Sequence, residues 1–362
     1  MAIKLSLCMI VKNEEKVLGR CLKSISKEID EIIVVDTGST DDTKRIAESF
    51  GAHVYDFTWI NDFAAARNFS FSLSKGDYII WLDADDVISE KSLSELNTLK
   101  TELDYSRPDV VMCPYIAATD EFGNSTLSYY RERIIKNGVG FKWEGFVHEC
   151  IAPRGKIINS EFSVMHAKPK ERTLGVSDRN LMIYIKNISA GKTLSARDKF
   201  YFGRELYYNR LYSEAIAVLN ESIEDSGVWG VNAIAACSVL SDCFRAKNET
   251  QNALFALLKS FEFGEPRAEI LYKTGEIFMN ENKLKEAIFW FESATKANDH
   301  LKDGDFEQPQ FKTLYPYLGL THCYGVLGQI DKALEYHKKA YSLAPNHPSV
   351  IYNEEYFKRL YD

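Results

Sequence analysis

The chain has 362 residues, of which 45% are hydrophobic and 27% are charged, and its formal net charge is −8. This length predicts two or three domains, each able to bury a core. The negative charge argues against a nucleic-acid coat and against a polybasic membrane anchor.

Two absences narrow the class of protein further. The seven cysteines are scattered and form no CxxC pair, which is typical of reduced thiols in the cytoplasm and not of a disulfide framework or a zinc site. No run reaches the roughly 18 apolar residues that a membrane-spanning helix needs. We therefore expect a cytoplasmic protein with no integral membrane segment and no nucleic-acid partner.

The first half of the chain alternates between strand and helix patterns. Leu5–Val11 and Glu31–Asp36 are apolar and β-branched runs, and apolar residues at three- and four-residue steps predict a helix between them, over about 15–26. A helix to about residue 50, a strand at 53–57, a helix at 63–74 and a strand at 78–82 follow. This order predicts right-handed crossovers and a mostly parallel, Rossmann-like α/β sheet, which binds ligands at the carboxyl ends of its strands.

Three carboxylates follow the last of these strands. Asp83, Asp85 and Asp86 come directly after the apolar run Tyr78–Leu82. Crowded carboxylates repel one another, and a divalent cation such as Mg²⁺ or Mn²⁺ removes the conflict. The alternative is a helix start, in which Asp85 or Asp86 caps a helix over 87–99.

Four ordered motifs resemble those of family 2 glycosyltransferases with the GT-A fold. They lie in residues 4–90 and comprise Leu7–Glu15, Ile32–Asp41, Phe63–Asn68 and Leu82–Asp85. The resemblance implies inverting transfer of a sugar from a nucleoside diphosphate, usually UDP. It also implies a Mn²⁺ or Mg²⁺ cofactor.

The resemblance also assigns roles to single residues. Asp36 would contact the uracil or ribose, with Gly38 shaping the turn behind it. The metal pair would be Asp83 and Asp85, with Asp85 as the direct ligand and a catalytic residue. The remaining residues implied near the nucleotide and sugar are Val11, Asn13, Glu14, Arg67 and Asn68.

Each of these residues also has a purely structural interpretation. Asp36 can cap the turn that follows it, and Asn13 can cap a helix. Arg67 can be a surface residue paired with Asp62. The joint occurrence of the motifs, and no single member, favours an enzyme.

The segment Trp143–Glu149 predicts the acceptor side of the chemistry. An inverting transfer needs a base for the acceptor and electrostatic relief for the leaving diphosphate. Glu144 and Glu149 are both candidates for the base, and Trp143 for stacking on the sugar or acceptor. We expect His148 to be a third metal ligand, with His166 as a weaker rival. The alternative is that the aromatic residues belong to the core and the glutamates are solvated.

The second half of the chain changes to helical periodicity. Four helix–turn–helix units align on a small residue in their second helix, at Ala215, Ala253, Ala287 and Ala333. A period of about 34 residues resembles tetratricopeptide repeats, which stack into a concave surface for a peptide or a second subunit. We expect a GT-A domain at 1–170, a helical linker at 171–197 and a repeat domain at 198–362. We predict that the basic segment Lys168–Arg172 forms a loop or lid and that 298–310 loops out.

Together the patterns and the family resemblance predict a metal-dependent, inverting transferase that moves a sugar from a UDP-sugar to an acceptor. Fusion of the two domains resembles the peptide S- and O-glycosyltransferases of the glycocin type, and this resemblance implies a Cys, Ser or Thr side chain of a peptide as the acceptor. The repeats would hold the acceptor or join two copies in a homodimer. The alternatives are a cell-envelope polysaccharide or glycolipid acceptor, and a non-catalytic repeat scaffold with a degenerate transferase domain.

Overall fold

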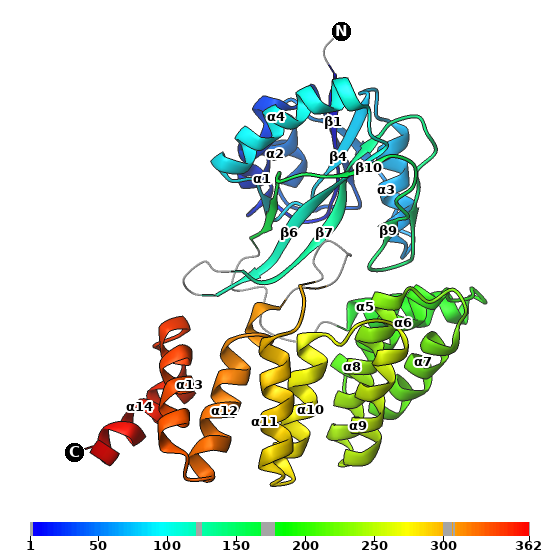
Figure 1. The fold of residues 1–362 in the computed structure, drawn as a ribbon. Coiled ribbons are helices and arrows are strands. Elements are labelled where there is room, and N and C mark those ends of the chain that lie inside the picture. The colour runs from blue at the N-terminus through cyan, green and yellow to red at the C-terminus, as the bar shows by residue number, and fades with distance from the viewer. Residues whose placement is uncertain (1–2, 121–124, 168–177, 300–305, 307, 362) are drawn as a thin grey trace. The chain divides into compact units, whose positions relative to one another are not determined.

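The computed structural model describes residues 3–120, 125–167, 178–299, 306 and 308–361 (Figure 1). The described residues divide into two compact units, one that ends at Tyr201 and one that begins at Phe202. The predicted lid at Lys168–Arg172 and most of the predicted insertion at 298–310 lie outside the described residues.

The first unit is built on one large mixed sheet. Its parallel half has the order β3-β2-β1-β4, formed by β3 (His53–Asp56), β2 (Glu31–Asp36), β1 (Leu5–Val11) and β4 (Tyr78–Trp81). The sheet continues in the order β7-β6-β11-β5, formed by β7 (Ser125–Lys136), β6 (Val110–Thr119), β11 (Val164–His166) and β5 (Asp86–Val87). The short strand β10 (Ile157–Asn159) pairs with β6. The predicted α/β fold with a mostly parallel sheet is confirmed, and the antiparallel strands β5 and β7 make it mixed.

Helices cover both faces of the sheet because its central strands are apolar on both sides. On one face lie α1 (Leu18–Ile25), α2 (Thr43–Ser49) and α4 (Glu90–Ser106). On the other lie α3 (Phe63–Ser72) and the hairpin of β8 (Trp143–Glu144) and β9 (Cys150–Ile151). Two further helices close the unit, α5 (Arg179–Ser189) and the start of α6 (Ala196–Tyr208).

The start of α4 corrects one alternative from the sequence. The helix begins at Glu90 and not at residue 87, and its cap is Ser89, whose side chain accepts a hydrogen bond from the backbone N–H of Ser92. Asp85 and Asp86 therefore do not cap it. Both lie between β4 and the helix, with Asp85 in a turn and Asp86 as the first residue of β5.

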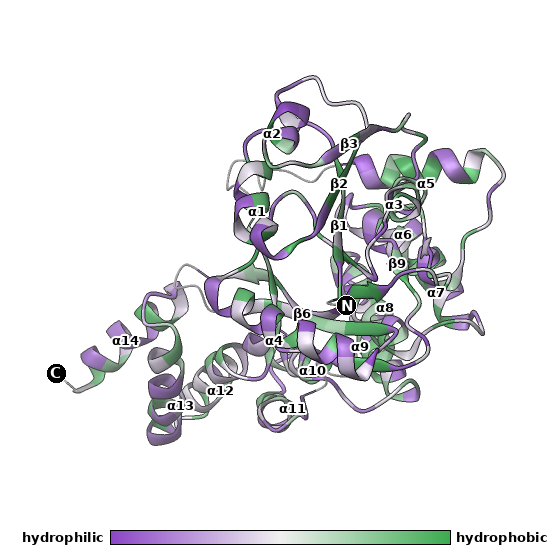
Figure 2. Cartoon of the chain, turned by 90° about the horizontal axis from the view of Figure 1, so that it is seen from above, coloured by the Kyte–Doolittle hydropathy of each residue, from purple (hydrophilic) through white to green (hydrophobic). Residues whose placement is uncertain are grey.

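The second unit consists of paired antiparallel helices that lie side by side (Figure 1). They are α6, α7 (Tyr212–Glu224), α8 (Gly230–Ala246), α9 (Thr250–Lys259), α10 (Ala268–Asn280), α11 (Leu284–Thr295), α12 (Leu314–Val326), α13 (Ile330–Leu343) and α14 (Pro348–Tyr361). Figure 2 shows these helices with hydrophobic and hydrophilic faces.

Small residues let the paired helices approach, as the sequence predicts. The four aligned alanines, at 215, 253, 287 and 333, are fully buried. Phe291 of α11 fills the space left by two glycines, because a Cβ atom at Gly275 would lie 2.7 Å from its ring and one at Gly319 would lie 2.6 Å from it. The helical repeat domain predicted from the periodicity is confirmed.

Candidate active site

Asp36 ends β2 at the carboxyl edge of the sheet, in register with Val11 of β1. It is fully buried, and its Oδ2 accepts hydrogen bonds from the backbone N–H groups of Gly38 and Ser39, at 3.0 and 2.9 Å. Its Oδ1 is also buried, with no hydrogen-bond partner among the described residues. Asp36 therefore supports the turn, as its structural interpretation predicts, and still presents one acceptor oxygen.

The loop after β1 is tied to the turn after β2. The backbone N–H of Asn13 donates to Ser39 Oγ, and the N–H of Thr40 donates to Asn13 Oδ1. The N–H of Glu14 donates to Thr43 Oγ1 at 2.7 Å. Asn13 and Glu14 thus lie beside the Asp36 turn, where the resemblance predicts the nucleotide. The side chain of Val11 instead packs in the hydrophobic core.

Asp86 is the structural member of the acidic turn after β4. It is fully buried and accepts hydrogen bonds from Arg133 at 3.1 Å, from the Tyr115 hydroxyl at 3.2 Å and from the backbone N–H of Asp83 at 3.0 Å. Arg133 is itself 1% exposed and stacks on the Trp81 ring, 3.7 Å from its centroid. The Asp86–Arg133 pair therefore fixes the turn that carries Asp83 and Asp85.

Asp85 lies close to His166, a residue of strand β11 that is distant from it in the sequence. Asp85, Asp86 and His166 each offer one atom that could bind a metal ion. These three atoms all lie within 4.8 Å of one another. The Nδ1 atom of His166 is 3.5 Å from Asp85 Oδ1 and has no hydrogen-bond partner among the described residues. Burial raises the pKa of Asp85, and Asp83 and Asp86 raise it further while His166 opposes them. The carboxyl group of Asp85 is therefore harder to ionise than that of an isolated aspartate.

Arg67 joins the acidic turn to the segment after β8. It is buried, and it donates to Asp83 Oδ1 at 2.6 Å and to Glu149 Oε1 at 2.5 Å. Its guanidinium also contacts the rings of Trp81 and Trp143, 4.9 and 4.8 Å from their centroids. Burial would raise the pKa of Asp83, but Arg67 and then Arg133 outweigh it and hold that pKa at about 2.

These contacts correct the surface interpretation of Arg67. Asp62 does not pair with it and instead caps α3, by accepting a hydrogen bond from the backbone N–H of Ala65. Asn68, the next residue, holds the β8 backbone through both of its side-chain groups: Nδ2 donates to the carbonyl of Trp143, and Oδ1 accepts from its N–H. The structure thus gives Asn68 a direct role in placing Trp143.

The remaining predicted residues lie around this centre in different environments. Trp143 is 2% exposed and packs edge-on against Trp81, with ring centroids 4.7 Å apart, so it belongs to the core. Glu144 is exposed. His148 stacks on Tyr201 at 4.4 Å and is not a member of the Asp85–Asp86–His166 cluster. His166, the weaker rival in the sequence, is the histidine that the structure brings to the acidic turn.

The sequence motifs do not single out three residues that hold the site in place, Arg133, Tyr115 and Glu132. Arg131, Glu132 and Arg133 are consecutive in β7, directly before the buried residues Ile134 and Ile135, and Glu132 pairs with Arg131 at 3.2 Å. A run of charged residues inside a buried strand is the signal that could have marked them.

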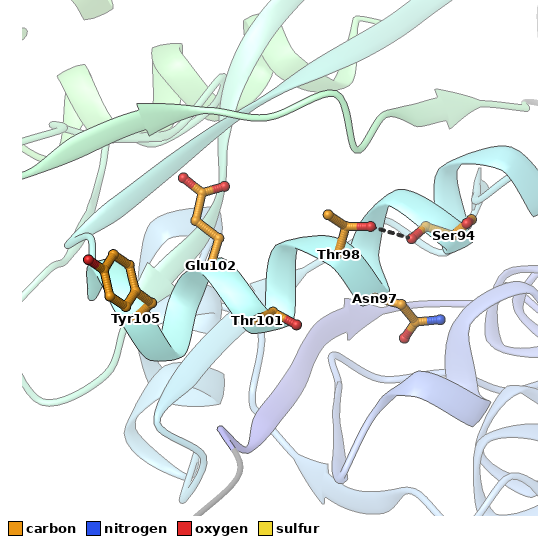
Figure 3. A pocket seen from close by; sticks show the side chains of 6 residues that line it. All are labelled: Ser94, Asn97, Thr98, Thr101, Glu102 and Tyr105. Carbon is orange, nitrogen blue, oxygen red and sulfur yellow. Dashed lines mark hydrogen bonds between the residues drawn. The ribbon is translucent and has the colours of Figure 1, made fainter.

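A separate shallow depression lies on the outer face of α4 (Figure 3). Its lining residues are Ser94, Asn97, Thr98, Thr101, Glu102 and Tyr105, all from this one helix. Glu102 is their only ionisable group apart from the Tyr105 phenol, so the depression has no set of converging polar groups from different elements. We assign no ligand to it.

Comparison with known proteins identifies a family model for part of each unit. Residues 6–161 match the family model described as glycosyl transferase family 2, and residues 268–300 and 317–347 match the tetratricopeptide repeat model. The first unit therefore contains a family 2 glycosyltransferase domain of the GT-A fold, the second contains tetratricopeptide repeats, and the chain is a glycosyltransferase.

The chain is similar to several known proteins. A TPR repeat-containing protein of Synechococcus elongatus is 26% identical over 94% of this chain and 76% of its own length. The SPbeta prophage-derived glycosyltransferase SunS of Bacillus subtilis is 30% identical over 60% of this chain, and the match spans about half of that relative, 52%. Among solved structures, TarS of S. aureus aligns with 69% of this chain and 54% of its own, with 14% identity and a TM-score of 0.41.

Two further observations concern the chain as a whole. Within the described part of the chain, every helix is too short or too polar to cross a membrane. All seven cysteines lie in that part and are unpaired, and six of them are buried.

Proposed function

We propose that this glycosyltransferase is metal-dependent and inverting, and that it transfers a sugar from a UDP-sugar to a Cys, Ser or Thr side chain of a peptide. The observation that carries the proposal is the arrangement around Arg67. It connects Asp83, beside the metal-type cluster, with Glu149, a carboxylate on the neighbouring segment. In this proposal one guanidinium, that of Arg67, contacts both the acidic segment of the leaving-group site, through Asp83, and the base, Glu149.

Asp85 and His166 fit a divalent cation. A carboxylate and an imidazole nitrogen are suitable ligands for Mn²⁺ and, less well, for Mg²⁺. The Nδ1 atom of His166 is buried and unpartnered among the described residues, and the carboxylates of Asp85 and Asp86 have charge for a cation to neutralise. Asp86 is already satisfied by Arg133 and Tyr115. We therefore propose Asp85 and His166 as the protein ligands, and the Asp83 and His148 ligands stay predictions.

The proposed reaction is a single displacement. The acceptor oxygen or sulfur attacks the anomeric carbon from the side opposite the diphosphate, and the bond from that carbon to the β-phosphate oxygen breaks. The acceptor proton passes to Glu149, and the electron pair of the broken bond leaves with UDP, so the anomeric configuration inverts. Bound divalent cation would neutralise the charge that develops on the leaving diphosphate.

Glu149 is the better base of the two predicted glutamates. Its carboxylate is held by Arg67, whose other contact is Asp83, so it belongs to the same cluster as the metal-type ligands. Glu144 is exposed on β8 and, among the described residues, forms no hydrogen bond or ion pair with that cluster. The pair Glu149→Gln and Glu144→Gln tests the choice, because the true base loses most of kcat while UDP binding remains.

The nucleotide would bind at the Asp36 turn. The unpartnered Oδ1 of Asp36 can accept from a uracil N–H or a ribose hydroxyl. The loop at Asn13 and Glu14 is fastened next to it. Replacing Asp36 by Asn should therefore weaken UDP binding more than it changes the turnover of bound donor.

The peptide acceptor is supported by the repeat domain. Stacked tetratricopeptide helices form a surface on which an extended peptide can lie. Pairing of two copies through the repeats, the other role predicted for them, stays a prediction. The unpaired cysteines support a reducing compartment, and we include a cytoplasmic location in the proposal.

The test is UDP release from a panel of UDP-sugars, with and without Mn²⁺, for the wild type and for an Asp83→Asn, Asp85→Asn double variant. We expect slow metal-dependent release without acceptor, lost in the variant and accelerated by peptides that contain Cys, Ser or Thr. Acceleration only by a lipid-linked or polysaccharide acceptor would replace the peptide. Equal release by wild type and variant would refute the metal role, and no release from any donor would favour the non-catalytic scaffold.

A further inference from the structure

The loop between β8 and β9 has an uncommon backbone conformation that depends on its surroundings. Trp143 pairs with Ile151 and Glu144 with Cys150, so Gly145–Glu149 is a five-residue hairpin loop. Gly145 has a φ of 99° and His148 a φ of 55°. A non-glycine residue in the left-handed region is uncommon and persists where its surroundings determine it.

Neighbouring elements hold the backbone of this loop through hydrogen bonds. Four consecutive backbone carbonyls each accept a hydrogen bond from a different structural element. The pairs are Phe146 O with the N–H of Phe63 in α3 at 3.2 Å, Val147 O with the hydroxyl of Tyr184 in α5 at 3.2 Å, His148 O with Nη2 of Arg197 in α6 at 3.2 Å, and Glu149 O with Nη2 of Arg131 in β7 at 3.3 Å.

Two of the four donors come from helices beyond the family match, which ends at residue 161. Tyr184 is fully buried, and its hydroxyl reaches the loop. Arg197 also lies over the ring of Tyr201, 4.7 Å from its centroid, and donates to its hydroxyl. The same Tyr201 ring stacks on His148. The first two turns of α6 therefore hold His148 by both its carbonyl and its side chain.

We propose that Tyr184 and Arg197 are positioning residues for Glu149, and that the catalytic frame of this chain extends through α5 into the first turn of α6. The inference rests on the proposed role of Glu149 as the base. Glu149 is the last residue of a loop in which four consecutive carbonyls each accept a hydrogen bond. Loss of one hydrogen-bond donor to these carbonyls lets the Glu149 carboxylate move relative to Arg67 and Asp83. A displacement of about 1 Å in a reacting group can cost about 100-fold in rate.

The test compares Tyr184→Phe and Arg197→Ala with two matched controls. Arg204→Ala removes the same type of Arg–Tyr pair further along α6. There Arg204 Nη2 lies 3.0 Å from the Tyr208 hydroxyl. Tyr324→Phe removes a hydroxyl from a buried tyrosine of the repeats, which donates to Glu292. Arg197→Lys, which keeps a cationic donor, is the conservative variant.

Two readouts are measured on the full chain. The first is amide hydrogen exchange in the segment 144–151, which should become faster in Tyr184→Phe and Arg197→Ala and stay unchanged in both controls. The second is donor hydrolysis without acceptor. For Arg197→Ala we expect kcat to fall by about 10- to 100-fold while KM for the donor stays within about twofold, since the donors to the four loop carbonyls lie in α3, α5, α6 and β7 and not in the nucleotide turn at Asp36. Arg197→Lys should recover part of that loss.

The outcomes separate this inference from the proposed function. Exchange and kcat that match those of Arg204→Ala and Tyr324→Phe would overturn it. A fall in kcat with an equal rise in donor KM would also overturn it, because general distortion would explain both. If the wild type releases no UDP from any donor, the proposed function fails, and exchange in 144–151 alone decides whether α5 and α6 hold the loop.

Discussion

Replacing Arg133 by methionine should destabilise the first unit strongly. Arg133 and Asp86 form an ion pair in which the two side chains are 1% and 0% exposed. Methionine fills much of the volume but removes the charge, so Asp86 remains buried with the Tyr115 hydroxyl and the Asp83 N–H as its remaining donors. Removing one partner of a buried pair typically costs about 3–5 kcal/mol.

The structure indicates a cost within that range. Besides the ion pair, Arg133 donates to the carbonyl of Trp81 at 3.2 Å and stacks on Trp81 and Tyr115, 3.7 and 4.4 Å from their centroids. Methionine keeps some of the packing and none of the hydrogen bonds. At about 2–4 °C per kcal/mol for a unit of this size, the melting temperature should fall by about 6–20 °C.

The assay is thermal and urea unfolding followed by tryptophan fluorescence, with the double variant Arg133→Met, Asp86→Asn as the matched control. Removing the orphaned charge should restore a large part of the stability, because two neutral groups need less solvation than one buried carboxylate. A single variant that loses less than about 1 kcal/mol, or a double variant no more stable than the single one, would refute the reasoning.

Two further predictions concern packing and capping. Gly319→Ala should destabilise the repeats by about 1–3 kcal/mol because its Cβ would lie 2.6 Å from Phe291, whereas Gly325→Ala in the same helix has 4.0 Å of clearance and should stabilise by about 0.5–1 kcal/mol. The reverse order in urea unfolding would contradict the packing argument. Ser89→Ala should cost about 1 kcal/mol, since it removes the acceptor for the N–H of Ser92. An unchanged unfolding midpoint for this variant would show that water replaces the cap.

Local patterns in the sequence predict the elements and the strand-end residues well. The apolar runs place β1, β2 and β4, and because these strands are parallel, Asp36 and the acidic turn come to one edge. The small residues at repeat spacing predict the helical pairs. Each of these features depends on residues close together in the chain or on a simple rule of topology.

The rest of the site depends on contacts between distant segments. His166 reaches Asp85 because β11 pairs with β5 across about 80 residues of sequence, which no local pattern specifies. Arg67 resembles a surface residue of an amphipathic helix until Glu149 and Asp83 close over it. Asp86 and Arg133 likewise form their pair because β4, which precedes Asp86 in the chain, is paired with β7, which carries Arg133.

The most direct measurement is a manganese titration of the UDP-bound protein, with free Mn²⁺ followed by its paramagnetic resonance signal. We compare the wild type with Asp85→Asn and His166→Gln, and use Asp56→Asn, an exposed aspartate on β3, as the control. The account predicts one tight site in the wild type and the control, weakened by about 10-fold or more in the other two. Equal manganese affinity in all four proteins would contradict the claim that Asp85 and His166 hold the catalytic cation.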